Sequence, residues 1–185
     1  MTPGASAAGS FAGRREIACE RSPLPVSVVA RYAEPVAVRL ELAGRVCISS
    51  GADHVGEEAL GRQGRLALAY LVCERRRPVP RDELAEVVWG EDLPESWEQM
   101  LRGIIARLRT CLRSVGVAAK QALTTTLGGY QFHLTAEWVV DVEMAAEAAQ
   151  AAFAATDPDR AAALAASAIE GASGQFLPGA AGLWV

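Results

Sequence analysis

The segment from Leu93 to Ser114 has the residue pattern of an amphipathic helix, and this pattern limits the folds open to the chain. Its large apolar residues recur at intervals of three and four, which places them along one face of a helix. They are Trp97, Leu101, Ile105, Leu108 and Leu112. Arginines at positions 102, 109 and 113 form a stripe on a second face. The pattern therefore predicts a helix that packs on one face and presents cations on another.

The charge of this region is opposite in sign to that of the whole chain. Between Gln99 and Ala136 there are five basic residues and no Asp or Glu, although the formal net charge of the 185 residues is -4. A local concentration of arginine favours binding to a polyanion such as nucleic acid. The overall acidity argues against a histone-like protein that coats DNA with its whole surface.

Short strands and two helices are predicted before the long helix. Residues 36–43 alternate between apolar and polar side chains, so we expect a strand there, then a turn at Gly44 and a second strand through Ile48. A short third strand is expected within residues 53–59.

Two helices are expected next, over residues 63–76 and 81–89, with prolines between them. Asp92 and Pro94 are expected to cap and begin the long helix.

A hairpin and two further helices are predicted after the long helix. Gly128 and Gly129 separate two β-favouring runs between Leu123 and Leu134, and paired glycines permit the positive φ angles of a tight turn. Alanine-rich residues 142–155 and 160–170 predict two antiparallel helices. Three helices followed by a hairpin is the order of a winged helix-turn-helix, whose last helix enters the major groove of DNA.

These residues resemble a known family of regulators. The stretches LGRQGRLALAYLVCERRRPVPRDELAEVVWG, LRGIIARLRTCL and LGGYQFHL are similar to the winged helix of the SARP or AfsR-like transcriptional regulators. The similarity covers residues 36–185 and is strongest over residues 60–134. It implies an α+β fold: an OmpR/PhoB-type winged helix-turn-helix with a small N-terminal antiparallel sheet, followed by a short TPR-like α-helical hairpin.

The resemblance also implies a domain organisation and partners. Residues 1–34 are expected to be a flexible leader, residues 35–136 the DNA-binding domain, and residues 137–185 part of a bacterial transcriptional activation domain. Such a protein binds double-stranded promoter DNA as a homodimer, recruits RNA polymerase and activates specialised-metabolite or similar genes.

The same resemblance assigns DNA-binding residues. On and before the long helix they are Arg81, Gln99, Arg102, Arg107, Arg109 and Arg113, and on the wing they are Thr126, Gly128 and Tyr130. Two of them have a structural alternative. Arg107 lies off the main arginine stripe and is equally consistent with an ion pair that braces the fold, and Tyr130 is consistent with the core of the wing.

Some residues depart from the family pattern. Trp97, Glu98 and Gln99 replace the residues common at these positions, and Gly103 interrupts the long helix with a residue that costs about 1 kcal/mol relative to alanine. The activation domain is also expected to be truncated after one helix pair. These departures leave a second hypothesis open, that of a protein-interaction module or truncated antagonist that dimerises with longer activators and binds DNA weakly or not at all.

No pattern in the sequence indicates catalysis, a cofactor or a metal site. The four cysteines lack CxxC spacing and are expected to be reduced and structural, with Cys73 on a buried helix face. Phosphate-loop and nucleophile motifs are absent from the sequence. Without a signal peptide or a run long enough to span a membrane, the expected location is the cytoplasm, in association with the nucleoid.

Overall fold

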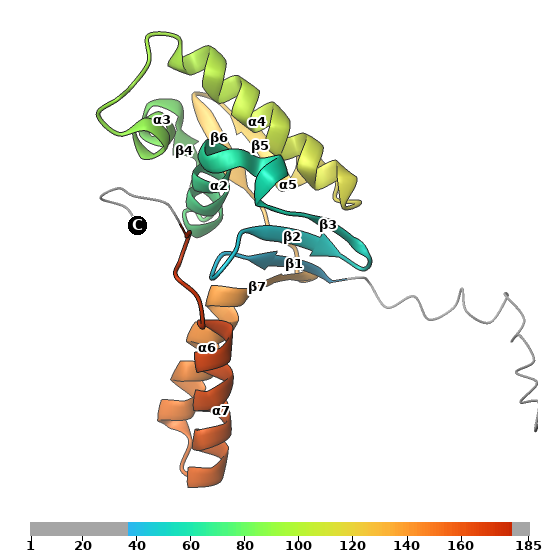
Figure 1. The fold of residues 1–185 in the computed structure, drawn as a ribbon, viewed down its shortest axis with the longest axis vertical. Coiled ribbons are helices and arrows are strands. Elements are labelled where there is room, and N and C mark those ends of the chain that lie inside the picture. The colour runs from blue at the N-terminus through green and yellow to red at the C-terminus, as the bar shows by residue number, and fades with distance from the viewer. Residues whose placement is uncertain (1–36, 179–185) are drawn as a thin grey trace, which may run out of the picture. The chain divides into compact units, whose positions relative to one another are not determined.

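The computed structural model describes residues 37–178, which form two small sheets and six helices of mixed α+β type (Figure 1). The predicted leader, residues 1–34, lies outside the described residues. The expected fold class, a winged helix preceded by a small sheet, is confirmed. None of the helices within residues 37–178 is long and apolar enough to cross a membrane.

The N-terminal sheet contains the three expected strands and one that the sequence did not reveal. Strands β1 (Val38–Glu41), β2 (Cys47–Ser50) and β3 (Asp53–Val55) are antiparallel neighbours. Strand β7 (Trp138–Val140) lies parallel to β1, which gives the order β3-β2-β1-β7. The third strand is shorter than predicted because a helix begins at Glu57.

Helix α2 (Glu57–Cys73) begins six residues earlier than predicted. Glycine at position 61 interrupts the helical pattern, and its φ of 68° lets the chain bend within the helix. The Glu57 side chain accepts a hydrogen bond from the Val46 backbone N–H at 3.0 Å, which ties the helix start to the sheet.

Helices α3 (Arg81–Trp89) and α4 (Trp97–Ser114) complete the helical part of the winged helix. The expected cap of α4 is wrong. The helix begins at Trp97 after Ser96, because the Trp97 N–H already bonds to the Pro94 carbonyl in a turn that precedes the helix.

The wing follows a short helix, α5 (Ala119–Ala122), and its strands β5 (Leu123–Thr126) and β6 (Gly129–Phe132) confirm the predicted hairpin. Strand β4 (Val79–Pro80), between α2 and α3, also pairs with β6. Glycine is required at position 129, because a Cβ there would lie 2.1 Å from the Val79 carbonyl oxygen.

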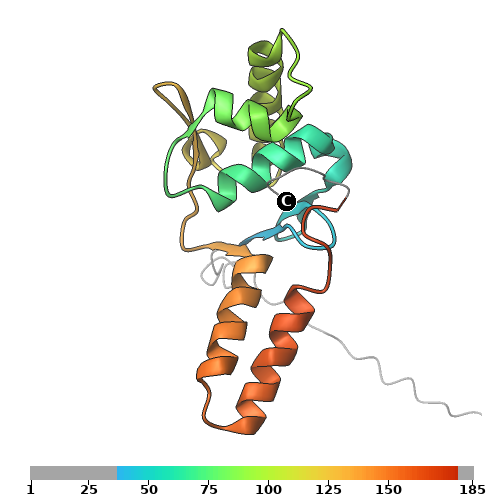
Figure 2. The same ribbon diagram turned by 90° about the vertical axis from the view of Figure 1, so that its left-hand side faces the viewer.

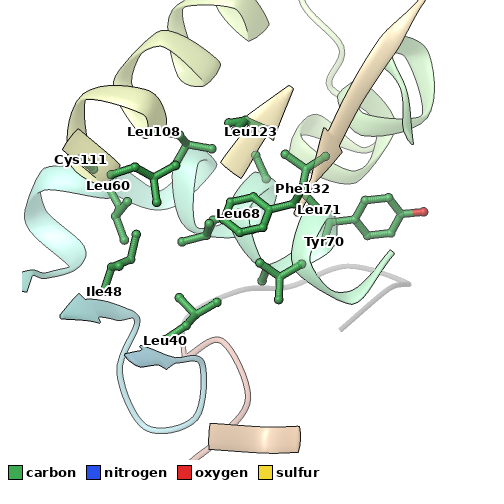
Figure 3. Close-up of a cluster of buried hydrophobic side chains, with 14 of the residues drawn as sticks. Leu40, Ile48, Leu60, Leu68, Tyr70, Leu71, Leu108, Cys111, Leu123 and Phe132 are labelled. Atoms are coloured by element: carbon green, nitrogen blue, oxygen red, sulfur yellow. The ribbon is translucent and has the colours of Figure 1, made fainter. Parts of the chain in front are cut away.

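One apolar core joins the sheet, the helices and the wing (Figure 3). Leu40 from β1, Leu68 from α2 and Phe132 from β6 are completely buried, and Leu108 from α4 is 1% exposed. Cys73 is exposed, contrary to prediction, because α2 ends there, and Cys47, Cys73 and Cys111 are all free thiols.

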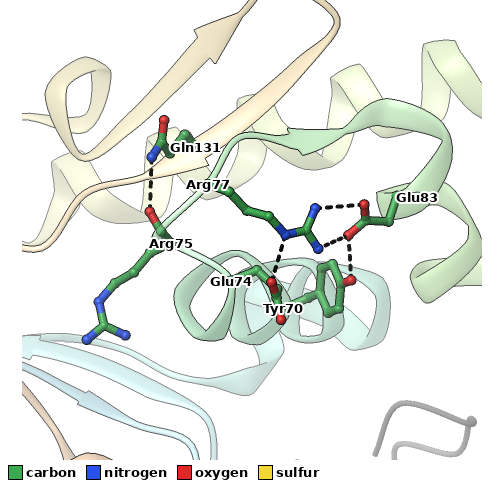
Figure 4. A network of polar contacts seen from close by, with 6 residues as sticks. All are labelled: Tyr70, Glu74, Arg75, Arg77, Glu83 and Gln131. Carbon is green, nitrogen blue, oxygen red and sulfur yellow. Dashed lines mark hydrogen bonds and ion pairs between the residues drawn. The ribbon is translucent and has the colours of Figure 1, made fainter.

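A polar network fixes the end of α2 to α3 (Figure 4). The Arg77 guanidinium donates to both oxygens of Glu83 at 2.9 and 2.6 Å and to Glu74 at 2.9 Å. The Tyr70 hydroxyl donates to Glu83. Burial and the adjacent Glu83 carboxylate raise the pKa of Tyr70 to about 12, whereas the hydrogen bonds from Arg77 lower the pKa of Glu83.

The C-terminal helices α6 (Asp141–Ala154) and α7 (Pro158–Gly171) lie side by side as an antiparallel hairpin (Figure 2). The Asp141 carboxylate accepts hydrogen bonds from the Leu42 and Ala43 N–H groups at 2.9–3.0 Å, beside the end of β1. Leu177 is buried and donates its N–H to the Leu42 carbonyl at 3.0 Å. Leu177 therefore packs beside the end of β1, a contact that no local pattern indicates.

We expect Asp141→Ala to loosen the attachment of the helical hairpin to the sheet. The substitution removes the acceptor for the backbone N–H groups of Leu42, Ala43 and Val142, which costs about 1–3 kcal/mol where such groups stay unpaired. Chemical denaturation should show this loss, and hydrogen exchange should be faster at Leu42 and Ala43. The matched control is Asp159→Ala, since Asp159 is exposed in the first turn of α7. Equal effects of the two substitutions would contradict the assignment.

The stability contributed by Glu83 should depend on pH. Because the folded-state pKa of Glu83 is lowered, its contribution is present above the unfolded pKa of about 4.3 and is lost as the pH falls through the folded value. Glu83→Gln should therefore lower the melting temperature by about 1–3 °C at pH 7 and by less at pH 3. Thermal unfolding at both pH values measures this, and a difference that grows towards acid pH would refute it.

Candidate nucleic-acid interface

The outer face of α4 is exposed because its inner face is fixed in the core. Leu101, Ile105 and Leu108 are at most 1% exposed, whereas the residues opposite them face solvent. The centre of this outer face is a line of residues at spacings of four, three and four, which are helical neighbours. The line consists of Gln99, Gly103, Ala106 and Thr110, all exposed.

Arginines lie along the two sides of this central line. Arg102 and Arg113 are exposed on the side nearer the wing. Arg102 has one acidic neighbour, Glu98, with 3.7 Å between the nearest side-chain atoms, and both side chains are more than half exposed. A pair this long and solvated contributes little, so it leaves the Arg102 guanidinium available to another anion.

Arg109 connects α4 to the wing. Its guanidinium donates to the Leu123 carbonyl at 3.1 and 2.8 Å and to the Thr125 hydroxyl at 2.9 Å. The side chain is half-buried and thus acts within the protein, holding β5 beside the helix. This role was not expected from the sequence, because the arginine stripe does not show which strand lies next to it.

Arg107 lies on the opposite side of the central line, towards α2. It is exposed, and one of its terminal nitrogens lies 3.4 Å from where a Cβ at Gly61 would be. Among residues 37–178 no acidic side chain forms an ion pair with it, so the structure gives no support to the alternative in which Arg107 braces the fold through a carboxylate. The closeness of α2 explains why Arg107 is set apart from the other arginines.

The residues of the wing that were predicted to bind DNA differ in their exposure to solvent. Tyr130 is 4% exposed and belongs to the core, and the Arg81 guanidinium carbon lies 5.9 Å from the centre of its ring. The Arg81 N–H also donates to the Gly128 carbonyl at 3.1 Å, so the start of α3 supports the turn. Gly128 is exposed with a φ of 92°, and Thr126 is half-buried.

The sequence reasoning missed two residues at this surface. Thr110 continues the central line, and its hydroxyl accepts a hydrogen bond from Arg113 at 2.8 Å. Leu127, at the tip of the wing, is fully exposed. The spacing of four, three and four from Gln99 was sufficient to find Thr110, whereas the exposure of Leu127 depends on the turn geometry.

A helix with an exposed, cation-flanked face beside a two-stranded wing defines a winged helix-turn-helix protein. Residues 57–132 match the family described as "Transcriptional regulatory protein, C terminal". Residues 57–132 are therefore similar to a domain of transcription regulators, and their winged helix is of the OmpR/PhoB type that the resemblance to the SARP regulators implied.

The fold is shared with a solved structure of EmbR from Mycobacterium tuberculosis, determined in complex with a low-affinity phosphopeptide. The TM-score is 0.68 at 21% sequence identity, and the match covers 77% of this chain. The chain spans only 38% of the EmbR chain. No curated protein sequence matches it.

We expect Arg109→Ala to destabilise the wing by about 1–2 kcal/mol, since it removes charge-assisted hydrogen bonds to Leu123 and Thr125. Hydrogen exchange in β5 and β6 should become faster. Arg113→Ala is the control, because the Arg113 guanidinium donates a hydrogen bond to Thr110 in its own helix, and its loss should change stability by less than about 0.5 kcal/mol. If both variants are equally stable, Arg109 does not support the wing.

Proposed function

We propose that this protein is a sequence-specific transcription regulator that binds promoter DNA, with α4 in the major groove and the wing, residues 123–134, on the flanking backbone or groove. The observation that carries the proposal is the outer face of α4. Neutral residues occupy its centre and arginines its two sides, and the wing lies beside it. Duplex DNA presents the matching arrangement, with base edges between two rows of phosphates.

The residues at this surface have different roles in the proposal. Arg102, Arg107 and Arg113 contact phosphates, because they are exposed on the sides of the helix. Gln99 and Thr110 contact base edges from the central line.

The wing has a supporting role as well as a contacting one. Thr126 and Gly128 contact the DNA backbone near the turn. Arg81, Arg109 and Tyr130 hold the wing in position, which is consistent with their contacts inside the protein.

The role in transcription is proposed from the family resemblance. The protein activates specialised-metabolite or similar genes, binds as a homodimer and recruits RNA polymerase. Residues 35–136 provide DNA binding, and the helices that follow provide the activation function. The hydrogen bonds of Asp141 to the end of β1 support this division of labour, since they hold the helices directly on the DNA-binding part.

The test is DNA binding by the full chain. A binding sequence is first selected from a random double-stranded library, and its affinity is then measured over a range of salt concentrations. The logarithm of the binding constant should fall linearly with the logarithm of salt concentration. The Arg102→Ala, Arg113→Ala double variant should bind more weakly, with a salt slope smaller in magnitude by about 2.

The control double variant is Arg76→Ala, Arg160→Ala, which removes the same charge from exposed positions outside α4 and the wing. It should bind like the wild type. Selection of no sequence, or equal losses in the two double variants, would refute binding through α4.

A second function, protein interaction with weak or no DNA binding, is favoured by one observation. Met144, Phe153 and Ile169 on the helical hairpin are 52%, 92% and 72% exposed. A chain that pairs with longer activators through these residues acts as an antagonist. If this chain forms a heterodimer with a longer activator but does not retain DNA at low salt, the second function holds and the first does not.

A further inference from the structure

Gly103 is a glycine that the fold itself does not need. It lies inside α4 with a helical backbone, and a Cβ added there would meet no atom within 4 Å. Gly129 is the opposite case, since a Cβ there would collide with the Val79 carbonyl. Glycine lowers the stability of a helix interior relative to alanine. Nothing in the described part of the chain compensates for this cost at position 103.

The position of Gly103 on the surface indicates why a glycine that destabilises the helix is present there. It is at the middle of the central line on the outer face of α4, with Ala106 as the next member. Over this part of the helix no side chain extends beyond a β carbon. Longer polar residues, Gln99 and Thr110, are at the two ends of the line, and arginines are along its sides. The surface is therefore lowest at Gly103, so another molecule can approach the backbone most closely there.

We propose that Gly103 and Ala106 form the point of closest approach to the bases, where they contact the methyl group of a thymine. This inference rests on the proposed function of DNA binding. The thymine C5-methyl is the apolar feature of the major groove, and small apolar surfaces such as alanine contact it. The open position at Gly103 admits the methyl group, and a side chain there displaces the helix outward and weakens the base contacts of Gln99 and Thr110.

The first measurement compares stability with DNA affinity in Gly103→Ala. The variant should melt about 2–4 °C higher than the wild type, because alanine favours the helix. It should bind the sequence selected by the wild-type chain at least tenfold more weakly. Affinity for an unrelated duplex should be unchanged, since phosphate contacts supply that binding. Opposite changes in stability and affinity exclude loss of folding as the cause.

The matched control is Ser167→Ala, which makes a helix-favouring substitution at an exposed position of α7. It should leave DNA affinity unchanged. If Gly103→Ala binds the selected sequence as tightly as the wild type does, the inference is wrong although the proposed function stands. Failure of the wild-type chain to select any sequence refutes the proposed function itself.

The second measurement identifies the thymine. Each thymine of the selected site is replaced in turn by deoxyuridine, which lacks only the methyl group. At one position the wild type should lose affinity about fourfold, the value of one buried methyl group. Gly103→Ala should bind the deoxyuridine site more tightly than the thymine site, because removal of the methyl makes room for the new side chain. If no deoxyuridine substitution distinguishes the two proteins, the methyl contact does not exist.

Discussion

The packing of α4 against α2 is the interaction on which the rest of the structure depends. Leu101, Ile105 and Leu108 are almost completely buried, and each such side chain stabilises the fold by roughly 1.5–3 kcal/mol. The helices come close at Gly64, where a Cβ would lie 3.8 Å from a methyl carbon of Leu108. Because the inner face of α4 is held this firmly, the direction of its outer face is also fixed.

The wing and the C-terminal helices are attached to this packed unit by polar contacts of the backbone. Arg109 bonds to the Leu123 carbonyl, and Asp141 bonds to the N–H groups at the end of β1. Arg75 contacts both parts. Its side chain pairs with Glu143 of α6. Its carbonyl accepts a hydrogen bond from Gln131 of the wing (Figure 4). The helical hairpin and the wing are therefore held to the same short segment at the end of α2.

Arginine has two uses in this domain, and exposure separates them. Arg102, Arg107 and Arg113 are exposed, and none of them forms a short ion pair with an acidic group in the described residues. Arg109 lies between them in the sequence but uses its donors on the wing. Three of the four arginines of α4 are thus exposed, and the fourth holds β5 beside the helix.

The sequence alone determined the elements whose order and spacing carry the pattern: α3, the apolar face of α4, and the hairpin around Gly128 and Gly129. These depend on local periodicity and turn chemistry, which neighbouring residues specify. Only the tertiary structure decided that β7 pairs with β1, that Leu177 is buried, and that Arg109 of α4 bonds to the wing. Each of these contacts joins residues distant in sequence or on different elements, and no local pattern specifies such a partner.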